Sequence, residues 1–342
     1  MTDIQQLHKE SIIIDGLFCH FEQPIPPTTE IPDMWLDHML ASGVTALNYS
    51  LIADANPMSM QSALLTIYEE SVMLDAFPDK ILHVKSVADL KLAKETKRLG
   101  IIFGTQGLAA VGTEMRYIWI LHKLGVRIMQ LTYNERSALG CGCMEPNDSG
   151  LTRFGQQAIE CMNRLGIVLD LSHVGERTSL EAIEHSNDPA IFSHAGVRSL
   201  CDNPRNLTDE QIKAVAKKGG VIGVCSHSVF VEKARGKRPT LDDYLDHIDY
   251  IIDLVGIDHV GVGTDNFQYG TAFAKIGRMK FERTNPSFFG GYGLEDKHAL
   301  GFSKWAEWPN LTKGLIGRGF SESDTKLVLG GNFLRVFGGV WK

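Results

Sequence analysis

The chain passes directly from a helix pattern into a strand pattern in the stretch Thr152-Arg-Phe-Gly-Gln-Gln-Ala-Ile-Glu-Cys-Met-Asn-Arg-Leu-Gly-Ile-Val-Leu-Asp-Leu-Ser-His173. Apolar residues recur at helical spacing as far as Leu165, and Gly166 is typical of a residue that ends a helix. Residues 167–171 are then almost continuously apolar, as expected of a strand that is buried on both faces. The stretch predicts one helix–strand unit with a histidine just after the strand.

The same alternation repeats along the whole chain. Strands that alternate with helices predict a parallel sheet, and eight units are the number that closes a (β/α)₈ barrel. An open doubly wound sheet is the alternative, but no G-x-G-x-x-G motif follows an early strand pattern. We therefore predict an α/β fold, a TIM barrel that forms one domain over residues 1–342. The eight apolar runs are residues 12–14, 44–48, 100–105, 127–132, 167–171, 190–193, 221–225 and 259–264.

Two stretches interrupt the alternation. Residues 134–150 follow the fourth run and are rich in Gly, Cys, Asn and Asp, and residues 266–303 follow the last run and hold many aromatic residues. Long loops after barrel strands shape the substrate pocket, so we expect both loops over the C-terminal rim of the barrel. The alternative is that each loop is an ordered excursion that packs on itself.

Composition narrows the class of protein. The 342 residues carry a formal net charge of −7, which argues against nucleic acid or an anionic membrane as the main partner. No apolar stretch is long enough to span a bilayer, and the polar N-terminus does not resemble a signal peptide. The six cysteines are therefore expected to be reduced thiols in a cytoplasmic protein, with Cys161 and Cys225 as buried packing residues. The composition leaves open whether the protein forms a homodimer.

Two histidines follow neighbouring strand patterns in the same way. His173 ends Asp170-Leu-Ser-His173, and His194 ends Ile191-Phe-Ser-His194. Parallel strands bring their carboxyl ends to one rim, which places the two imidazoles within reach of one ion. Neutral imidazole is a common ligand of zinc and other transition metals. The pattern predicts a metal site, and two structural histidines are the alternative.

Three further residues follow the strand patterns on the same rim. Asp265 ends Gly263-Thr-Asp265, where a carboxylate can bind a metal, accept a proton from water, or simply cap the loop. Arg205 is a candidate to bind a substrate carboxylate, with a loop salt bridge as the alternative. His227 is a candidate substrate contact or a surface residue.

At these residues the chain resembles the membrane (renal-type) dipeptidase family, a set of zinc-dependent (β/α)₈ metallohydrolases. The similarity extends over residues 11–342 and is most specific between residues 150 and 209. The segments that carry it are Gly150-Leu-Thr-Arg-Phe-Gly155, Glu160-Cys-Met-Asn-Arg-Leu-Gly166, Asp170-Leu-Ser-His173, Ile191-Phe-Ser-His194, Asn203-Pro-Arg-Asn-Leu-Thr-Asp209, Ile257-Asp-His-Val-Gly-Val-Gly-Thr-Asp265 and Leu329-Gly-Gly-Asn-Phe-Leu-Arg335.

The resemblance implies roles for four residues. The family hydrolyses dipeptides, including some with a D-residue at the C-terminal position, and uses two zinc ions. His173 and His194 match two zinc ligands of the family. Asp265 matches the acid that follows its last strand, and Arg205 matches the arginine that binds the substrate carboxylate.

The chain departs from the family at the other metal positions. Leu17 and Cys19 stand where the family has a His and an Asp ligand, Gln106 stands at its bridging Glu, and Tyr133 at its catalytic His. Two dications close together need anionic ligands to offset their repulsion. We therefore expect one ion, zinc or another divalent metal, held by His173, His194 and Asp265. Cys19 and Gln106 are further candidates for contact with it.

The predicted function is a metal-dependent hydrolase. It would cleave an amide or peptide-like bond in a small carboxylate-bearing substrate, such as a dipeptide, through a metal-activated water. Asp265 would be the base, Tyr133 a donor to the developing oxyanion, and Arg205, Tyr133 and His227 substrate contacts. The alternatives are changed chemistry, as in a lyase or isomerase, and a catalytically weak small-molecule binding protein.

Overall fold

Eight parallel strands close into a barrel in the computed structural model, which describes residues 2–19, 33–53, 59–267, 292–293 and 296–342. The barrel closes because β1 pairs with β2 on one edge and with β9 on the other, where Asp15 lies opposite Val262. The predicted TIM barrel is confirmed. Its strands are β1 (Ile14–Cys19), β2 (Ala46–Ala53), β4 (Leu99–Gln106), β5 (Val126–Gln130), β6 (Val168–Asp170), β7 (Ile191–Ala195), β8 (Val221–Val224) and β9 (Val260–Val262).

The first strand is longer than its apolar run and continues through Asp15. This carboxylate is fully buried, and it accepts hydrogen bonds from the backbone N–H of Thr264 at 2.8 Å and from the Thr264 hydroxyl at 2.5 Å. Burial raises the pKa of Asp15 to about 7, and the bonds from Thr264 oppose that shift. Asp15 therefore lies inside the strand and ties β1 to the end of β9.

Two short strands were not predicted. β3 (Ile81–His83) pairs with the first residues of β4. It lies on the same edge of β4 as β5, which pairs with β4 from Phe103 onward. β10 (Asn266–Phe267) pairs with the end of β1. Both strands add to the barrel wall without entering the closed ring.

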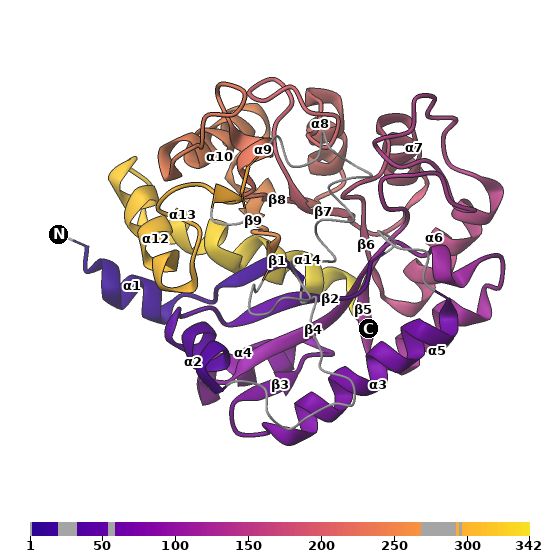
Figure 1. Ribbon diagram of the computed structural model, residues 1–342, viewed down its shortest axis with the longest axis horizontal. Helices are drawn as coiled ribbons and strands as arrows, with labels where there is room; N and C mark the ends of the chain where they lie inside the picture. The colour runs from indigo at the N-terminus through magenta and orange to yellow at the C-terminus, as the bar shows by residue number, and fades with distance from the viewer. Residues whose placement is uncertain (1, 20–32, 54–58, 268–291, 294–295) are drawn as a thin grey trace.

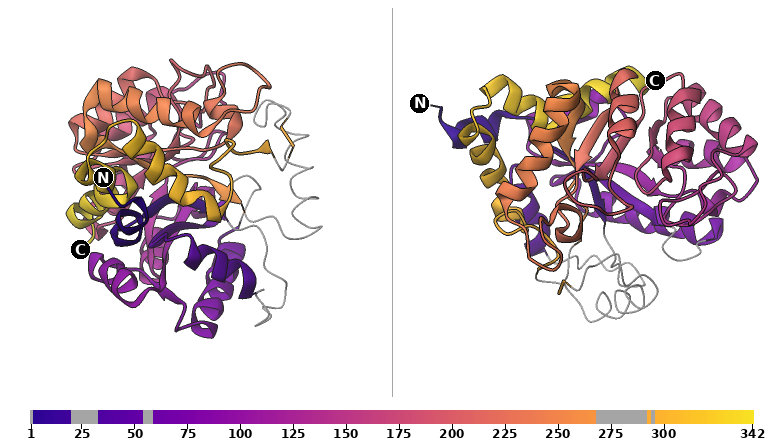
Figure 2. Two further views of the ribbon diagram at one scale, coloured as in Figure 1. Left: turned by 90° about the vertical axis from the view of Figure 1, so that its left-hand side faces the viewer. Right: turned by 90° about the horizontal axis from the view of Figure 1, so that it is seen from above.

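The helices surround the strands (Figures 1 and 2). Thr152 caps the helix that opens the stretch quoted first, and Thr240 caps the helix over Leu241–Val255. The helices are α1 (Ile4–Glu10), α2 (Asp33–Ala41), α3 (Met60–Ala76), α4 (Val87–Thr96), α5 (Arg116–Lys123), α6 (Arg153–Leu165), α7 (Glu176–His185), α8 (Asp209–Lys217), α9 (Ser228–Val231), α10 (Leu241–Val255), α12 (Trp308–Gly317), α13 (Glu322–Lys326) and α14 (Asn332–Val340).

Helix α14 closes the N-terminal end of the barrel, where it crosses the ends of the strands (Figure 1). Its Phe333 and Phe337 are fully buried and belong to one apolar cluster with residues near the starts of seven barrel strands. The opposite, C-terminal rim is therefore the open end available for chemistry. The strand members of the cluster are Ile14, Ala46, Ile102, Ile128, Val168, Ile191 and Val221.

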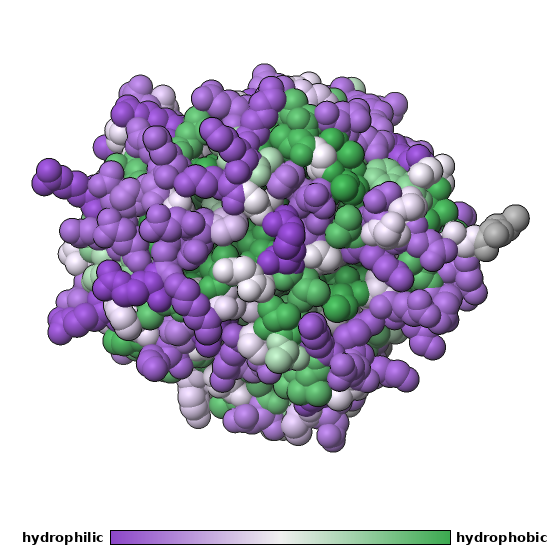
Figure 3. Space-filling model, turned by 180° about the vertical axis from the view of Figure 1, so that it is seen from behind, coloured by the Kyte–Doolittle hydropathy of each residue, from purple (hydrophilic) through white to green (hydrophobic). Residues whose placement is uncertain are grey.

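The surface seen from behind is mostly polar, with apolar side chains gathered toward its centre (Figure 3). Across the described ranges, no helix combines the length and the apolar character needed to cross a membrane. Of the two predicted loops, residues 134–150 form an irregular segment after β5, and most of residues 266–303 lie outside the described part of the chain.

Glycines at the strand ends let the barrel wall close tightly. A Cβ atom on Gly263 would lie 1.9 Å from the backbone oxygen of Ser193. We expect Gly263→Ala to lower the free energy of unfolding by about 1–3 kcal/mol or more, because the contact is with rigid backbone. Chemical denaturation measures the loss. Gly317→Ala is the matched control, since nothing lies within 4 Å of its Cβ position, and an equal loss in both variants would contradict the packing argument.

Candidate active site

Two histidines meet at the ends of neighbouring strands. His173 follows β6 and His194 lies within β7, and their Nε2 atoms are 3.0 Å apart. Both side chains are buried, at 2% and 0% exposure. His173 has a φ of 66°, in the left-handed region that non-glycine residues adopt at a cost of roughly 1 kcal/mol or more. The backbone is thus strained where it aims this imidazole at its partner.

Buried polar groups fix the orientation of both rings. Asp170 accepts hydrogen bonds from the backbone N–H groups of Ser172 and Ser193 and from the Ser193 hydroxyl, the last at 2.5 Å. The Ser193 oxygen lies 2.8 Å from His194 Nδ1, and Asn134 Oδ1 lies 2.7 Å from His173 Nδ1. The serine before His194 therefore links the imidazole to a buried carboxylate.

These contacts set the tautomer of each imidazole. Because Ser193 donates its proton to Asp170, its oxygen accepts the Nδ1–H of His194. The carbonyl oxygen of Asn134 can only accept, so His173 also carries its proton on Nδ1. Each Nε2 then presents a lone pair toward the other. Two facing lone pairs need a cation between them, so the pair, called the histidine dyad below, fits a shared metal ion.

The surroundings keep these imidazoles neutral. Burial holds the pKa of His173 and of His194 well below the usual value, and the Arg205 guanidinium adds to the shift in both. Burial likewise lowers the pKa of His227, with Lys297 as the next cause. Neutral imidazoles are the form that binds metal.

Arg205 is a buried cation placed beside the dyad. It is 2% exposed, and its Nη2 donates to the backbone oxygen of His194 at 2.6 Å. Its Nε and Nη1 have no hydrogen-bond partner among the described residues, and no described carboxylate forms an ion pair with it. The expected alternative, a loop salt bridge, is thus not seen in this part of the chain. Two free donors on one planar group can bind a carboxylate.

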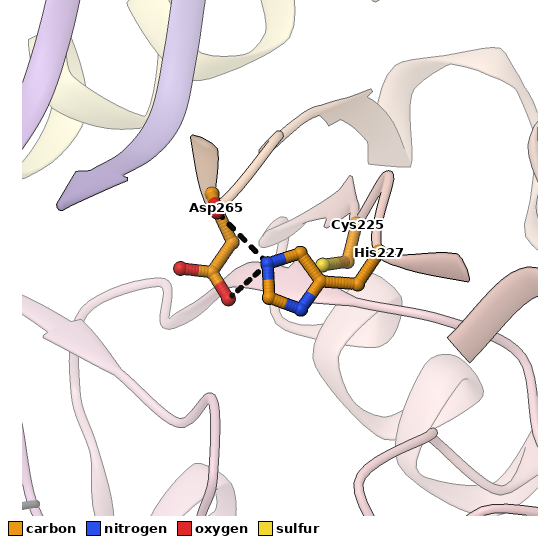
Figure 4. Close-up of side chains that lie close together, drawn as sticks. All are labelled: Cys225, His227 and Asp265. Carbon is orange, nitrogen blue, oxygen red and sulfur yellow. Dashed lines mark hydrogen bonds and ion pairs between the residues drawn. The ribbon is translucent and has the colours of Figure 1, made fainter. Parts of the chain in front are cut away.

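Asp265 contacts His227 (Figure 4). His227 Nε2 lies 3.2 Å from the carboxylate oxygen Oδ2 and 2.9 Å from the backbone oxygen of Asp265. The ligand atoms of Cys225, His227 and Asp265 all lie within 4.8 Å of one another, and no other described set of three His, Cys, Asp or Glu residues meets that limit. Asp265 is therefore not grouped closely with both dyad nitrogens.

The other predicted site residues differ in what the structure shows. The ring of Tyr133 stacks on His173, with centroids 4.1 Å apart and planes 23° apart. Gln106 is buried, and its Nε2 donates to the Ser50 hydroxyl at 3.1 Å. Cys19 ends β1, but its side chain lies outside the described part of the structure.

Sequence reasoning missed several residues of the site. Lys297 and His298, each 3% exposed, are brought beside His227 because residues 297–299 bond to the backbone of residues 226–228. The ring centroid of His298 lies 4.8 Å from that of His227. Asn134 had no signal in the sequence, whereas the serine repeated before each histidine could have indicated the Ser193 contact.

Fold and rim together define a (β/α)₈ barrel with a histidine site at the carboxyl ends of its strands. The profile of the family described as membrane dipeptidase (peptidase family M19) matches residues 1–277. A dipeptidase of Aspergillus oryzae, aclJ, is 29% identical over 272 residues, which is 78% of this chain and 58% of that protein. The chain thus spans less than two thirds of this relative.

Solved structures share the fold of this chain. An amidohydrolase from Pseudomonas aeruginosa is 33% identical, with a TM-score of 0.87 over 99% of each chain. A metallopeptidase from Rhodobacter sphaeroides, solved with a phosphinate mimic of L-Ala-D-Ala, is 20% identical, with a TM-score of 0.77 over 97% of this chain and 100% of the other. The protein belongs to the membrane dipeptidase family.

Proposed function

We propose that the protein is a metal-dependent hydrolase that cleaves an amide or peptide-like bond in a small, carboxylate-bearing substrate such as a dipeptide. The observation that carries the proposal is the histidine dyad, with both Nε2 lone pairs 3.0 Å apart and turned toward each other. Family membership and the similarity to an amidohydrolase support hydrolysis over the alternatives of a lyase, an isomerase or a binding protein.

The metal that the family implies fits this dyad. Two nitrogen ligands on one tetrahedral zinc lie about 3.4 Å apart when each bond is about 2.0–2.1 Å, close to the 3.0 Å between the Nε2 atoms. We propose one zinc ion held by His173 and His194. The metal, when bound, would supply the Lewis acidity that activates water and polarises the scissile carbonyl. Cys19 and Gln106 stay candidate contacts.

Residues of the protein would bind the substrate, accept the proton and stabilise the oxyanion. The two free donors of Arg205 would bind the substrate carboxylate and so orient the scissile bond. Asp265 would accept the proton of the attacking water, with His227 holding its carboxylate. Tyr133, stacked on His173, would donate a hydrogen bond to the oxyanion that forms.

Hydrolysis of a dipeptide panel tests the proposal, with substrates that end in L- or D-residues. We expect turnover by the protein as purified, its loss after treatment with a chelator, and recovery when zinc is added back. A C-terminally amidated panel serves as the control for carboxylate recognition. Turnover that chelation leaves unchanged, or no turnover of any panel member with zinc present, would contradict the proposal.

Ser193 offers a prediction about metal affinity. Removal of the hydroxyl in Ser193→Ala frees His194 to adopt either tautomer, so we expect the zinc Kd to rise about 10–100-fold. Competition with a coloured chelator measures the Kd. Ser193→Thr keeps the hydroxyl and is the matched variant, expected to retain most of the affinity. Equal affinities in all three proteins would show that the hydroxyl does not orient the ligand.

For the cellular setting we propose the cytoplasm. The cysteines with described side chains, Cys141, Cys143, Cys161, Cys201 and Cys225, are all free thiols, which supports a reducing compartment. A homodimer stays a prediction that sedimentation velocity can test.

A further inference from the structure

A second group of potential metal ligands lies beside the dyad, at the ends of β8 and β9. Cys225 follows β8 directly, His227 comes two residues later, and Asp265 follows β9 (Figure 4). Their side chains are 0%, 1% and 3% exposed. All three point toward one another, and their ligand atoms lie within 4.8 Å. We call these three residues the thiol cluster.

The spacing of the thiol cluster is close to that of a tetrahedral ion. Nitrogen and oxygen ligands on one zinc lie about 3.4 Å apart, and sulfur and nitrogen ligands about 3.6 Å apart. His227 Nε2 and Asp265 Oδ2 are already 3.2 Å apart, and Cys225 Sγ lies within 4.8 Å of both ligand atoms. An ion can therefore take the place of the proton on His227 Nε2, which moves to Nδ1 of the same ring, with only a small approach of the sulfur.

The charges of the thiol cluster also suit a divalent ion. Without an ion, burial raises the pKa of Cys225 well above its usual value, so the residue is a thiol. When the ion binds, the S–H bond breaks, the proton leaves to solvent and an Sγ–metal bond forms. The thiolate and the Asp265 carboxylate then offset both charges of the ion, whereas the histidine dyad offers only neutral ligands.

We propose that Cys225, His227 and Asp265 form a second metal site, selective for a thiophilic divalent ion such as zinc, that inhibits the enzyme when occupied. A thiolate, an imidazole and a carboxylate leave one position of a tetrahedral ion for water or a substrate atom. The ion takes the Asp265 carboxylate that would otherwise accept the proton during hydrolysis. The inhibitory effect rests on the proposed function, but binding of the ion does not.

Cobalt titration of the metal-free protein tests the site without any activity measurement. Co²⁺ bound to a thiolate gives a ligand-to-metal charge-transfer band in the near ultraviolet, which two imidazoles do not give. We expect this band in the wild type, with an intensity of one thiolate per chain. Cys225→Ser should abolish it, and His227→Gln should weaken Co²⁺ binding at this site by at least about 10–100-fold. Circular dichroism checks that each variant folds.

Two further variants make the assignment specific. Cys161→Ser, which changes a thiol on α6, should keep the band, and so should His173→Ala, since the dyad is a separate site. Excess zinc should inhibit hydrolysis in the wild type and much less in Cys225→Ala. Cobalt binding without the band, a band that survives in Cys225→Ser, or a band lost in His173→Ala would overturn the second site. Loss of hydrolysis in every protein, with the band intact, would overturn only the proposed function.

Discussion

Asp265→Asn is expected to lower kcat by about 10²–10⁴-fold, with little change in KM. The carboxylate is buried and held by His227 at 3.2 Å, so its replacement removes the proton acceptor but keeps the shape of the side chain. The histidine dyad is untouched, so the zinc content of the purified protein should stay the same. Steady-state kinetics on the best dipeptide substrate measures both constants.

Asp258→Asn is the matched control for this prediction. Asp258 is exposed and lies just before β9, and its substitution should leave kcat unchanged. If Asp265→Asn keeps wild-type kcat, the carboxylate is not the proton acceptor. If both kcat and the bound zinc are lost, Asp265 is a ligand of the zinc of the dyad, as the sequence suggested.

Arg205→Met is expected to raise KM by roughly 30- to 5,000-fold. The loss of one partner of a buried, hydrogen-bonded charge pair costs about 2–5 kcal/mol of binding free energy. Methionine also fills part of the space of the guanidinium beside Phe230, whose ring centroid lies 5.8 Å from Arg205 Cζ. The substitution removes a buried cation that has no described carboxylate partner, so the thermal stability should not fall much.

Substrates with an amidated C-terminus separate recognition from structure. The wild type should lose affinity for the amidated dipeptide by a factor close to that of the Arg205→Met substitution. The variant should treat the acid and the amide alike, because the interaction that distinguishes them has been removed. A variant that still prefers the free acid would show that another group binds the carboxylate.

The barrel and the dyad could be predicted because their signals are local. Each apolar run marks a buried strand, and the repeated Ser-His ending places His173 and His194 on adjacent strand ends. The structure brings their Nε2 atoms to 3.0 Å. Leu241–Val255 could likewise be predicted, since its cap, its apolar spacing and its terminal glycine all lie within one segment.

Features that depend on contacts between residues far apart in the chain could not be predicted from the sequence. Asp15 follows the first apolar run, and only its contact with Thr264, 249 positions away, shows that it lies inside β1. Lys297 and His298 reach the site through backbone pairing with residues 226–228. Cys225 was expected to be a buried packing residue, and it is buried. Its position near Asp265 could not be predicted, because it depends on β8 and β9 lying side by side in the barrel.

The metal content of protein purified without chelator and without added metal tests the central claim most directly. Elemental mass spectrometry should find one equivalent of zinc per chain in the wild type and almost none in His194→Ala, because the dyad holds the ion that the proposed hydrolysis requires. A zinc content that is the same in the wild type and in His194→Ala, or no zinc in the wild type, would contradict an ion held between His173 and His194, whereas an equivalent that only Cys225→Ser loses would belong to the thiol cluster.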